Sequence, residues 1–157
     1  MIRIEFNDHD VNAALTRLGA RMGDMTDVMQ EIGEALAEST EARFAAGTTP
    51  EGTAWTPKSA ATLAKYARGK KTADTRPLHY TLALLQNIYP QAGADFVEIG
   101  SGEPYAAMMQ FGGQKEKFPH LWGDIPARPF LGISEDDRAA ILEIVGEWFE
   151  RAAGGAP

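Results

Sequence analysis

The sequence predicts an α+β fold, in which a small antiparallel sheet is packed by a long helix in the N-terminal half and by a helix at the C-terminus. Three patterns support this fold class. Apolar residues recur three or four positions apart over 24–44 and over 135–149, as they do on the buried face of a helix. Apolar and polar residues alternate over 96–99, after a turn-forming run at 91–95, which predicts a hairpin with 87–89 as its other strand.

The N-terminal part of the chain is predicted to form one strand and two helices. Residues 2–6 alternate between apolar and charged side chains, which is typical of a half-buried strand. Apolar residues four and three apart over 11–18 predict a short amphipathic helix. Asp24 can cap the long helix that follows, and Gly47 ends it. At 1.5 Å per residue, this helix spans roughly 30 Å and is expected to cover the sheet.

The middle of the chain is predicted to consist of short helices separated by a loop. Ser59 or Thr62 can start a brief helix, and the apolar residues of 78–85 predict another one. Between them, residues 68–76 contain no apolar residue except Ala73 and carry four basic side chains. Because they offer few apolar side chains to bury, we expect a mobile loop there.

The stretch 97–134 contains the two segments around which we expect the rest of the chain to be organised. Residues 100–102 are Gly-Ser-Gly, which allows a tight turn after the hairpin. Pro104 suits the first turn of a helix over 105–111, since its missing N–H would have no partner there. Gly112 ends this helix, so it can only be short.

The second segment of this stretch begins after a loop that we expect to be mobile, at 113–124. Pro126 and Pro129 then bracket Arg128, and proline stiffens the backbone while it removes a donor from any strand ladder. We therefore expect an extended segment at the edge of the sheet, with 128–133 as a third strand beside the N-terminal strand and the hairpin.

The last helix begins after Ser134, which can act as its N-cap and is followed by three acidic residues. Acidic side chains suit the positive end of the helix dipole. Burial of a large apolar side chain stabilises a fold by about 1.5–3 kcal/mol, so the apolar stripes of both long helices should enter the core. The side chains expected to be buried are those of Ile32, Leu36, Phe44, Ile99, Phe130, Leu142, Val145 and Trp148.

Length and composition favour a single domain over 1–157, since the chain has 157 residues of which 44% are hydrophobic. It contains no cysteine, which excludes disulfides and thiol catalysis. It has no apolar run of about 18 residues and no secretory signal pattern, so we expect a protein made in a cytoplasm and no membrane partner. The net charge is −7, yet residues 58–76 carry six basic residues against one acid.

The chain shows no pattern that predicts catalysis, so we expect no enzyme, no cofactor and no metal. His9, His79 and His120 do not have the spacing of metal ligands, and we expect His79 to be either satisfied or exposed. The Gly-Ser-Gly turn at 100–102 lacks the further glycine of a dinucleotide site. No phosphate-binding loop and no nucleophile elbow occurs.

The order of short motifs resembles the virion morphogenesis or tail completion proteins of Mu-like, contractile-tailed phages and their prophages. The similarity runs from about Phe44 to Ser134, and it depends on the ordered set rather than on any one motif. The chain departs from the family at 79–81, where relatives have a Thr-Gly step. The matching motifs are Phe44, Pro50-Glu51-Gly52, Trp55-x-Pro57, Thr62, the leucines 78, 82 and 85, Val97-x-Ile99-Gly100-Ser101, Tyr105-Ala106, Gln110-Phe111-Gly112 and Ile125-Pro126-Ala127-Arg128-Pro129-Phe130-Leu131-Gly132.

The resemblance implies a structural protein without catalytic activity, located at the neck or tail of the virion where the tail joins the head. It implies a homo-oligomeric ring, with a hexamer as one candidate size. The partners implied are the tail terminator or tube proteins or the head connector proteins, and DNA passes nearby without specific binding.

Side chains for contacts are expected on the stretch 97–134 and on the basic segment. The planar guanidinium of Arg128 suits pairing with carboxylates, and the alternative is that it pairs with an acid of its own subunit. Phe130 is expected in the core and Tyr105 in a contact, while acidic residues on the long helix and near the hairpin would face the lumen of the ring. The candidate interface residues are Tyr105, Phe111, Arg128, Lys70 and Lys71.

Two other classes of function remain open from the sequence. The first alternative is a nucleic-acid-associated binding domain that uses the basic segment 58–76, and the second is a small hydrolase. Binding to DNA that weakens steeply with salt would favour the nucleic-acid alternative, because phosphate contacts release counterions.

Overall fold

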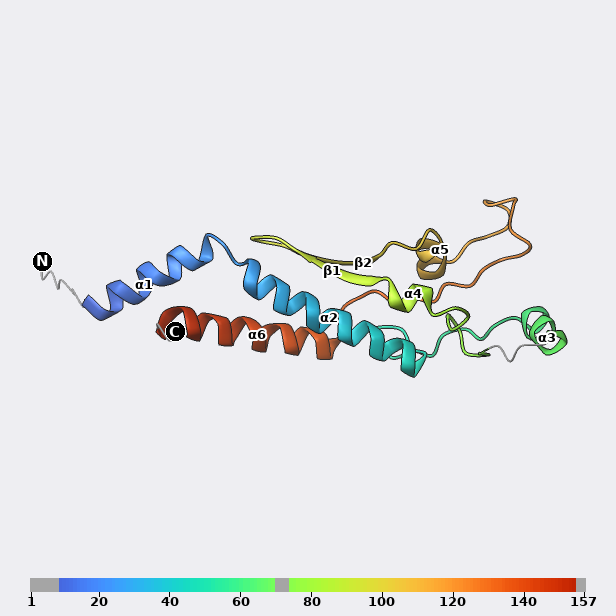
Figure 1. Ribbon diagram of the computed structural model, residues 1–157, viewed down its shortest axis with the longest axis horizontal. Helices are drawn as coiled ribbons and strands as arrows, with labels where there is room; N and C mark the ends of the chain where they lie inside the picture. The colour runs from blue at the N-terminus through green and yellow to red at the C-terminus, as the bar shows by residue number, and fades with distance from the viewer. Residues whose placement is uncertain (1–8, 70–73, 155–157) are drawn as a thin grey trace, which may run out of the picture.

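A computed structural model describes residues 9–69 and 74–154 of the chain. The molecule is elongated and built around helix α2 (Thr26–Ala46), with helix α6 (Glu135–Gly154) along one side of it and a β-hairpin along the other (Figure 1). The hairpin pairs β1 (Ile88–Ala92) with β2 (Val97–Ser101) in antiparallel register. The predicted α+β class, with one long helix in the N-terminal half and one at the C-terminus, is confirmed.

The C-terminal end predicted for α2 is confirmed, whereas its N-cap is Met25, which makes no side-chain capping bond, and Asp24 lies one position before it. The carboxylate of Asp24 accepts a hydrogen bond from the backbone N–H of Thr26 at 3.0 Å. At the other end, Gly47 adopts φ 71° and donates its N–H to the carbonyl of Arg43. A left-handed residue at this position satisfies one of the carbonyls that would otherwise have no partner at the end of a helix.

Helix α6 begins with a reciprocal cap, as its sequence predicted. The hydroxyl of Ser134 accepts from the backbone N–H of Asp137 at 3.1 Å, and the carboxylate of Asp137 accepts from the N–H of Ser134 at 2.7 Å. Aspartate here does what glutamate does in the usual capping box.

Two apolar clusters form the core. In the first, between α2, α6 and the hairpin, Gly33 lies so close to the hairpin that a Cβ on it would meet Pro90 at 2.7 Å. The second lies at the C-terminal end of α2. Buried in the first are Val28, Ile32, Leu36 and Trp148, and in the second Phe44, Trp55, Leu84, Ala106 and Phe130.

Most of the predicted core is confirmed, with one error on α6. The side chains of Ile99 and Val145 are partly buried against the first cluster. Leu142 is 73% exposed, so its predicted burial is wrong. The face of α6 that packs on α2 is formed by residues 141, 144, 145 and 148, and position 142 lies a third of a turn away from it.

The predicted third strand, 128–133, is wrong. Among the described residues, β1 and β2 form the sheet alone, and 128–133 has no ladder partner. Pro129 removes one donor, and the N–H and C=O groups of this segment bond to side chains and to turns instead of to a strand. The predicted N-terminal strand over 2–6 lies outside the described residues.

Shorter helices and loops occupy the rest of the chain. Helix α1 (His9–Met22) packs on α6, and α3 (Ala60–Arg68) starts at Ser59, whose hydroxyl accepts from the N–H of Thr62 at 3.2 Å. Helix α5 spans Ala106–Phe111. These three helices confirm the sequence prediction, and α1 and α3 lie at opposite ends of the molecule (Figure 1).

The predicted helix over 78–85 is mostly wrong. Only α4 (Ala83–Gln86) is helical, because Leu78 and Leu82 have φ values of 62° and 61°. Such left-handed residues interrupt a right-handed helix, and they are unfavourable for leucine.

The two predicted loops differ in how much of them the structure describes. Residues 70–73 of the first lie outside the described part. The second, 113–124, contains tight turns and is closed by an isolated bridge between Gly113 and Ile125. The mobility of both loops remains a prediction.

Candidate partner-binding groove

Two motifs of the sequence, Trp55-x-Pro57 and 126–132, meet in the structure. The indole N–H of Trp55 donates to the carbonyl of Pro129 at 2.8 Å. In return, the guanidinium of Arg128 donates through Nε to the carbonyl of Thr56 at 2.7 Å and through Nη2 to that of Pro57 at 2.9 Å. These three bonds hold the two segments side by side although 71 or more positions separate them in the chain.

The ring of Phe44 lies at the centre of this junction. It makes edge contacts with Trp55 at 5.3 Å and with Phe130 at 5.5 Å between ring centroids. His79 approaches the same ring at 6.1 Å and its Nδ1 donates to the carbonyl of Pro77 at 2.7 Å. Of the two alternatives predicted for His79, the structure therefore shows the satisfied one, and the side chain is buried.

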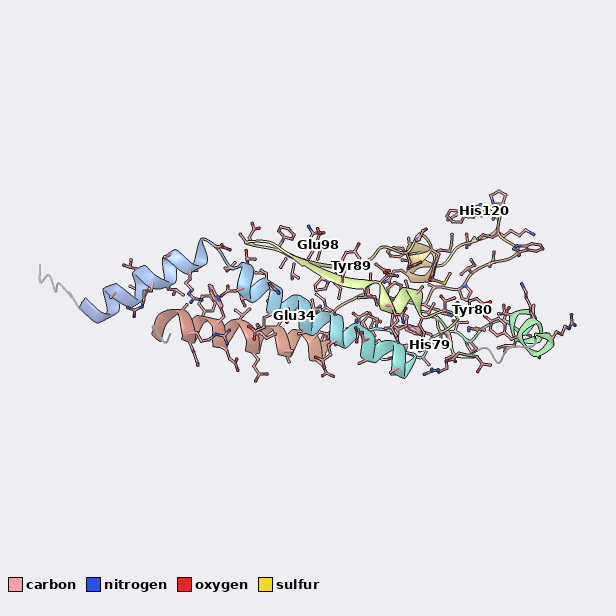
Figure 2. The ribbon with its side chains drawn as sticks, viewed as in Figure 1. Glu34, His79, Tyr80, Tyr89, Glu98 and His120 are labelled. Carbon is pink, nitrogen blue, oxygen red and sulfur yellow. The ribbon has the colours of Figure 1, made fainter. Side chains whose placement is uncertain are left out.

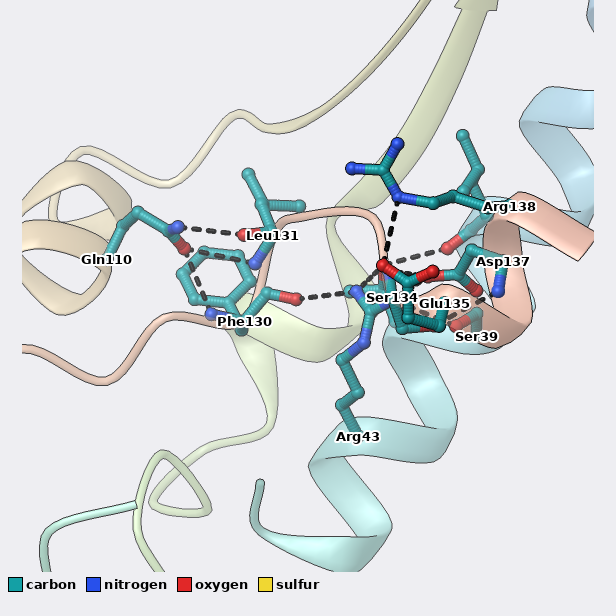
Figure 3. A network of polar contacts seen from close by, with 11 residues as sticks. Ser39, Arg43, Gln110, Phe130, Leu131, Ser134, Glu135, Asp137 and Arg138 are labelled. Carbon is teal, nitrogen blue, oxygen red and sulfur yellow. Dashed lines mark hydrogen bonds and ion pairs between the residues drawn. The ribbon is translucent and has the colours of Figure 1, made fainter. Parts of the chain in front are cut away.

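Gln110 of α5 holds the segment after Arg128 by a clamp of hydrogen bonds (Figure 3). Its Oε1 accepts from the N–H groups of Phe130 and Leu131, each at 3.0 Å, and its Nε2 donates to the carbonyl of Leu131 at 2.9 Å. The side-chain amide thereby takes the place of a neighbouring strand, which explains how 128–133 stays extended outside a sheet.

A buried ion pair between Arg43 and Asp137 fixes α6 to α2 beside this clamp (Figure 3). Arg43 also donates to the carbonyl of Phe130 at 3.2 Å and to the hydroxyl of Ser39 at 3.0 Å. Burial alone would raise the pKa of Asp137, but hydrogen bonds from Ser39 and Ser134 and the charge of Arg43 hold that pKa below its ordinary value.

Arg128 serves the fold but keeps part of its binding capacity. Its side chain is 92% buried, since 8% is exposed, and burial lowers the pKa of its guanidinium. The alternative that it pairs with an acid of its own subunit is wrong for the described part of the chain, where its partners are backbone carbonyls. Its Nη1 donates no hydrogen bond to any described residue.

Arg128 lines an open groove of about 500 Å³, which we name the Lys58–Arg128 groove. The start of α3 forms one wall and the 78–84 segment another, and α5 and the 124–128 segment complete it. The stacked rings of Tyr66 and Tyr80, 5.5 Å apart, join α3 to the 78–84 segment. The groove is lined by Lys58, Ser59, Thr62, Leu78, Tyr80, Thr81, Leu84, Tyr105, Met109, Asp124, Ile125, Pro126 and Arg128.

The charges of this groove are two cations and one acid. Lys58 lies beside Arg128, and its Nζ donates to the carbonyl of Asp74 at 2.7 Å while it lies 4.9 Å from the centre of the Tyr66 ring. Burial and the charge of Arg128 lower the pKa of Lys58, whereas Asp74 acts against that shift. The acid is Asp124, whose carboxylate accepts from the backbone N–H of Lys115 at 2.8 Å.

The structure brings together only two of the five predicted interface residues. Tyr105 lies in the Lys58–Arg128 groove with Arg128, and burial and the charge of Glu103 raise the pKa of its phenol. Phe111 is 79% exposed and lies beside a different, smaller hollow next to Phe130. Lys70 and Lys71 lie outside the described residues. Their interface roles remain predictions.

Three relevant residues were missed by the sequence analysis. Lys58 was considered only as part of the basic segment 58–76, and Tyr80 and Trp122 were not singled out, because nothing local indicates that Lys58 and Tyr80 line a groove with Arg128. The side chain of Trp122 is fully exposed. A tryptophan inside a polar loop is the signal that could have marked it as a contact residue.

The described residues contain no cluster of His, Asp or Glu that could hold a metal ion. Over the same part of the chain, no helix combines the length and apolar character needed to cross a membrane.

Comparison with known proteins identifies the family. The model of the phage virion morphogenesis family matches residues 6–150, which is nearly the whole chain. The chain belongs to this family. Its members act in the assembly of phage particles, and the role of this protein is therefore structural. The resemblance found in the sequence is confirmed.

Two curated relatives have a similar length. The chain is 30% identical to the Mu-like prophage FluMu G protein 2 of Haemophilus influenzae over 151 residues, covering 96% of this chain and 97% of the relative. It is 31% identical to the putative capsid assembly protein G of Escherichia phage Mu over 137 residues, covering 86% of this chain and 85% of that protein. No solved structure matches the chain significantly.

Proposed function

We propose that this morphogenesis protein completes the tail of a contractile-tailed phage or prophage, where it forms a homo-oligomeric ring at the neck that joins tail to head. Family membership supports the assembly role, and the name of the Mu relative, a putative capsid assembly protein, agrees with it. The observation that supports the ring is that the subunit exposes two apolar surfaces, one on the β-hairpin and one on α6.

The first surface is the outer face of the hairpin. Ile88, Pro90 and Ala92 point toward α2, so the alternate residues of β1 point away from it. Tyr89 and Phe96 are exposed, and Tyr89 and Glu98 lie on the outer side of the molecule (Figure 2).

The second surface is a face of α6 outside its buried stripe. Leu142 and Phe149 are both exposed and lie seven positions apart, which places them on one side of the helix. Exposed apolar patches on a soluble subunit often mark protein contacts. Because the hairpin and α6 lie on opposite sides of α2, a contact between the two surfaces would join unlike faces of neighbouring subunits.

Contacts between unlike faces generate a ring when the rotation closes. Around such a ring, the net charge of −7 discourages DNA from adhering, since like charges repel and no counterions are released. Not every acid contributes freely, because Glu31 pairs with Arg151 at 3.1 Å. Glu34 and Glu38 are exposed on α2. The proposed partners are tail terminator or tube proteins, or head connector proteins.

The test is Leu142→Glu, examined by native mass spectrometry and by incorporation into particles. Leu142 is exposed in the subunit, so the substitution should leave the melting temperature within a few degrees of wild type. A charge in an apolar contact should abolish the oligomer and reduce the protein in particles at least tenfold. Leu15→Glu is the matched control, because Leu15 is also exposed but lies on α1, and this variant should assemble normally. Normal oligomers of Leu142→Glu would contradict the ring surface.

The location is tested separately from the contact. Antibody or gold labelling of particles that carry a tagged subunit should place the label at the junction of head and tail. Label on the capsid shell, or a protein absent from finished particles, would contradict the neck.

A further inference from the structure

We propose that the Lys58–Arg128 groove binds an extended acidic peptide segment of another virion protein, with a carboxylate held between Lys58 and Arg128. This inference rests on the proposed function only for the source of the partner. The groove itself is defined by the described residues of one subunit.

The first argument is charge. Arg128 is 92% buried with no carboxylate partner among the described residues, and it lines the groove together with Lys58. A buried positive charge is unfavourable unless it is paired or hydrogen-bonded. Backbone carbonyls satisfy Nε and Nη2, which leaves Nη1 available to a ligand.

The arrangement of Lys58 supports the same ligand. Burial lowers the pKa of Lys58, and the charge of Arg128 lowers it further while the charge of Asp74 opposes the shift, so Lys58 and Arg128 are close enough to repel each other. A carboxylate bound between them would relieve this repulsion, and it would accept charge-assisted hydrogen bonds from both. Asp124, the acid of the groove, already accepts from the N–H of Lys115.

The apolar walls favour a peptide over nucleic acid. Five of the thirteen lining residues are apolar, namely Leu78, Leu84, Met109, Ile125 and Pro126, and only Lys58 and Arg128 are basic, whereas a site for DNA phosphates would be expected to present many basic groups. Apolar walls suit an aliphatic or aromatic side chain next to the bound acid. Tyr80 and Tyr105 add exposed rings at the same site, and tyrosine is enriched where proteins bind each other.

The size of the groove fits a few residues rather than a helix or a whole domain. A volume of about 500 Å³ lies in the range of sites that enclose a small ligand, roughly 300–1,000 Å³. We therefore place an extended segment there, which enters with one acidic and one apolar side chain.

Zero-length cross-linking with a carbodiimide tests the proposal, because it joins an amine to a carboxylate only when the two are in contact. The reaction is run on purified particles and on the lysate of induced cells, which also contains assembly intermediates. We expect Lys58 to be coupled to an Asp, a Glu or a terminal carboxylate of another virion protein, identified by mass spectrometry. Lys58→Arg should lose this product, because the carbodiimide joins carboxylates to amines and not to a guanidinium.

Lys65→Arg is the matched control, since Lys65 lies on the exposed side of α3 and does not line the groove. It should leave the Lys58 product unchanged. Coupling of Lys58 only to Asp74 or Asp124 of its own chain would overturn the proposal. So would coupling to a second copy of this chain, or a product that disappears when nuclease removes DNA.

Charge reversal then tests whether the contact matters. Lys58→Glu should reduce incorporation at least tenfold, and replacing the cross-linked acid of the partner by lysine should restore it. The melting temperature of Lys58→Glu is measured in parallel, because Lys58 also donates to the carbonyl of Asp74. If that variant does not fold, the cross-link of the wild type and its loss in Lys58→Arg decide the question. If this protein is absent from particles but is cross-linked through Lys58 to a virion protein in the lysate, the neck location is contradicted and the proposed peptide binding by the groove is supported.

Discussion

Arg43 of α2 and Asp137 of α6 form an ion pair in which each side chain is only 7% exposed. The pair lies at the point where the 126–132 segment passes into α6, and the same guanidinium binds the carbonyl of Phe130. Breaking a buried ion pair leaves an uncompensated charge, which costs far more than the loss of a surface pair. The pair therefore joins α2 to α6, and Arg43 connects both helices to the 126–132 segment.

Asp137→Asn should lower the free energy of unfolding by roughly 3 kcal/mol or more, because the charge of Arg43 then remains buried without a counter-ion. Urea denaturation at pH 7 measures it. Asp136→Asn is the control, since Asp136 is exposed beside it and its replacement should change stability by less than about 0.5 kcal/mol. Equal effects of the two substitutions would show that the pair does not stabilise the fold.

The same carboxylate should make stability depend on pH in the acid range. The pKa of Asp137 is lower in the folded protein than its ordinary value, which is about 3.9 in an unfolded chain. Its contribution is then complete above about pH 4 and is lost as the pH falls through the folded-state pKa. The difference in unfolding free energy between wild type and Asp137→Asn should therefore shrink below pH 4. A difference that stays constant down to pH 2.5 would contradict the lowered pKa.

Truncation to alanine should strongly destabilise the fold at Trp148 on α6 and should have almost no effect on stability at Leu142. Trp148 is 1% exposed and its indole N–H donates to Asp27 at 3.2 Å, so Trp148→Ala should cost roughly 3–5 kcal/mol. Leu142→Ala should cost less than about 0.5 kcal/mol, because that side chain is already in water. Thermal melts of both variants check this. A large loss of stability in Leu142→Ala would show that Leu142 is buried, as the sequence predicted.

The sequence was most informative where local patterns decide the structure. Residues with caps or clear periodicity, such as Ser134 and the α2 stripe, were placed correctly because their partners lie within a few positions. The errors arose where distant residues decide. Periodicity could not show that Leu78 and Leu82 adopt positive φ, nor that Gln110 would replace a strand beside 128–133.

The candidate site was predictable only in part, for the same physical reason. Arg128 and Tyr105 were singled out by their chemistry and by the rigid segments that carry them. Lys58 lies 70 positions before Arg128, and only the contacts of Trp55 and of Arg128 itself with the facing segments bring the two together. A single sequence gives no signal for such a pairing.

Gly112 should tolerate substitution less well than Gly47, although both have positive φ, 73° and 71°. An alanine at Gly47 pays about 1–2 kcal/mol for the left-handed conformation, whereas Gly112 combines its positive φ with a ψ of 177°, a conformation that is essentially restricted to glycine. At Gly112 the added Cβ would also lie 2.8 Å from the N of Ala127 and from the O of Ile125, whereas at Gly47 nothing lies within 4 Å. Because the clashing atoms belong to the backbone, Gly112→Ala should show the clearly lower melting temperature. Equal melting temperatures would mean that the segment at 125–127 moves aside freely.

Arg128→Ala should lose both stability and incorporation, because the side chain supports the fold and also faces the groove. Removing it deprives the carbonyls of Thr56 and Pro57 of their donors, and a part-buried acceptor without a partner costs about 1–3 kcal/mol. Arg128→Lys should recover little of this loss, since one ammonium group does not reproduce the planar fork that reaches both carbonyls. Phe111→Ala is the comparison, because a side chain that is 79% exposed can be lost with a change of less than about 0.5 kcal/mol. Urea denaturation of the free subunit, followed by quantification in particles relative to folded protein, separates the two roles. Arg128→Ala with wild-type stability would mean that the two bonds from Arg128 to the carbonyls of Thr56 and Pro57 do not hold the groove together.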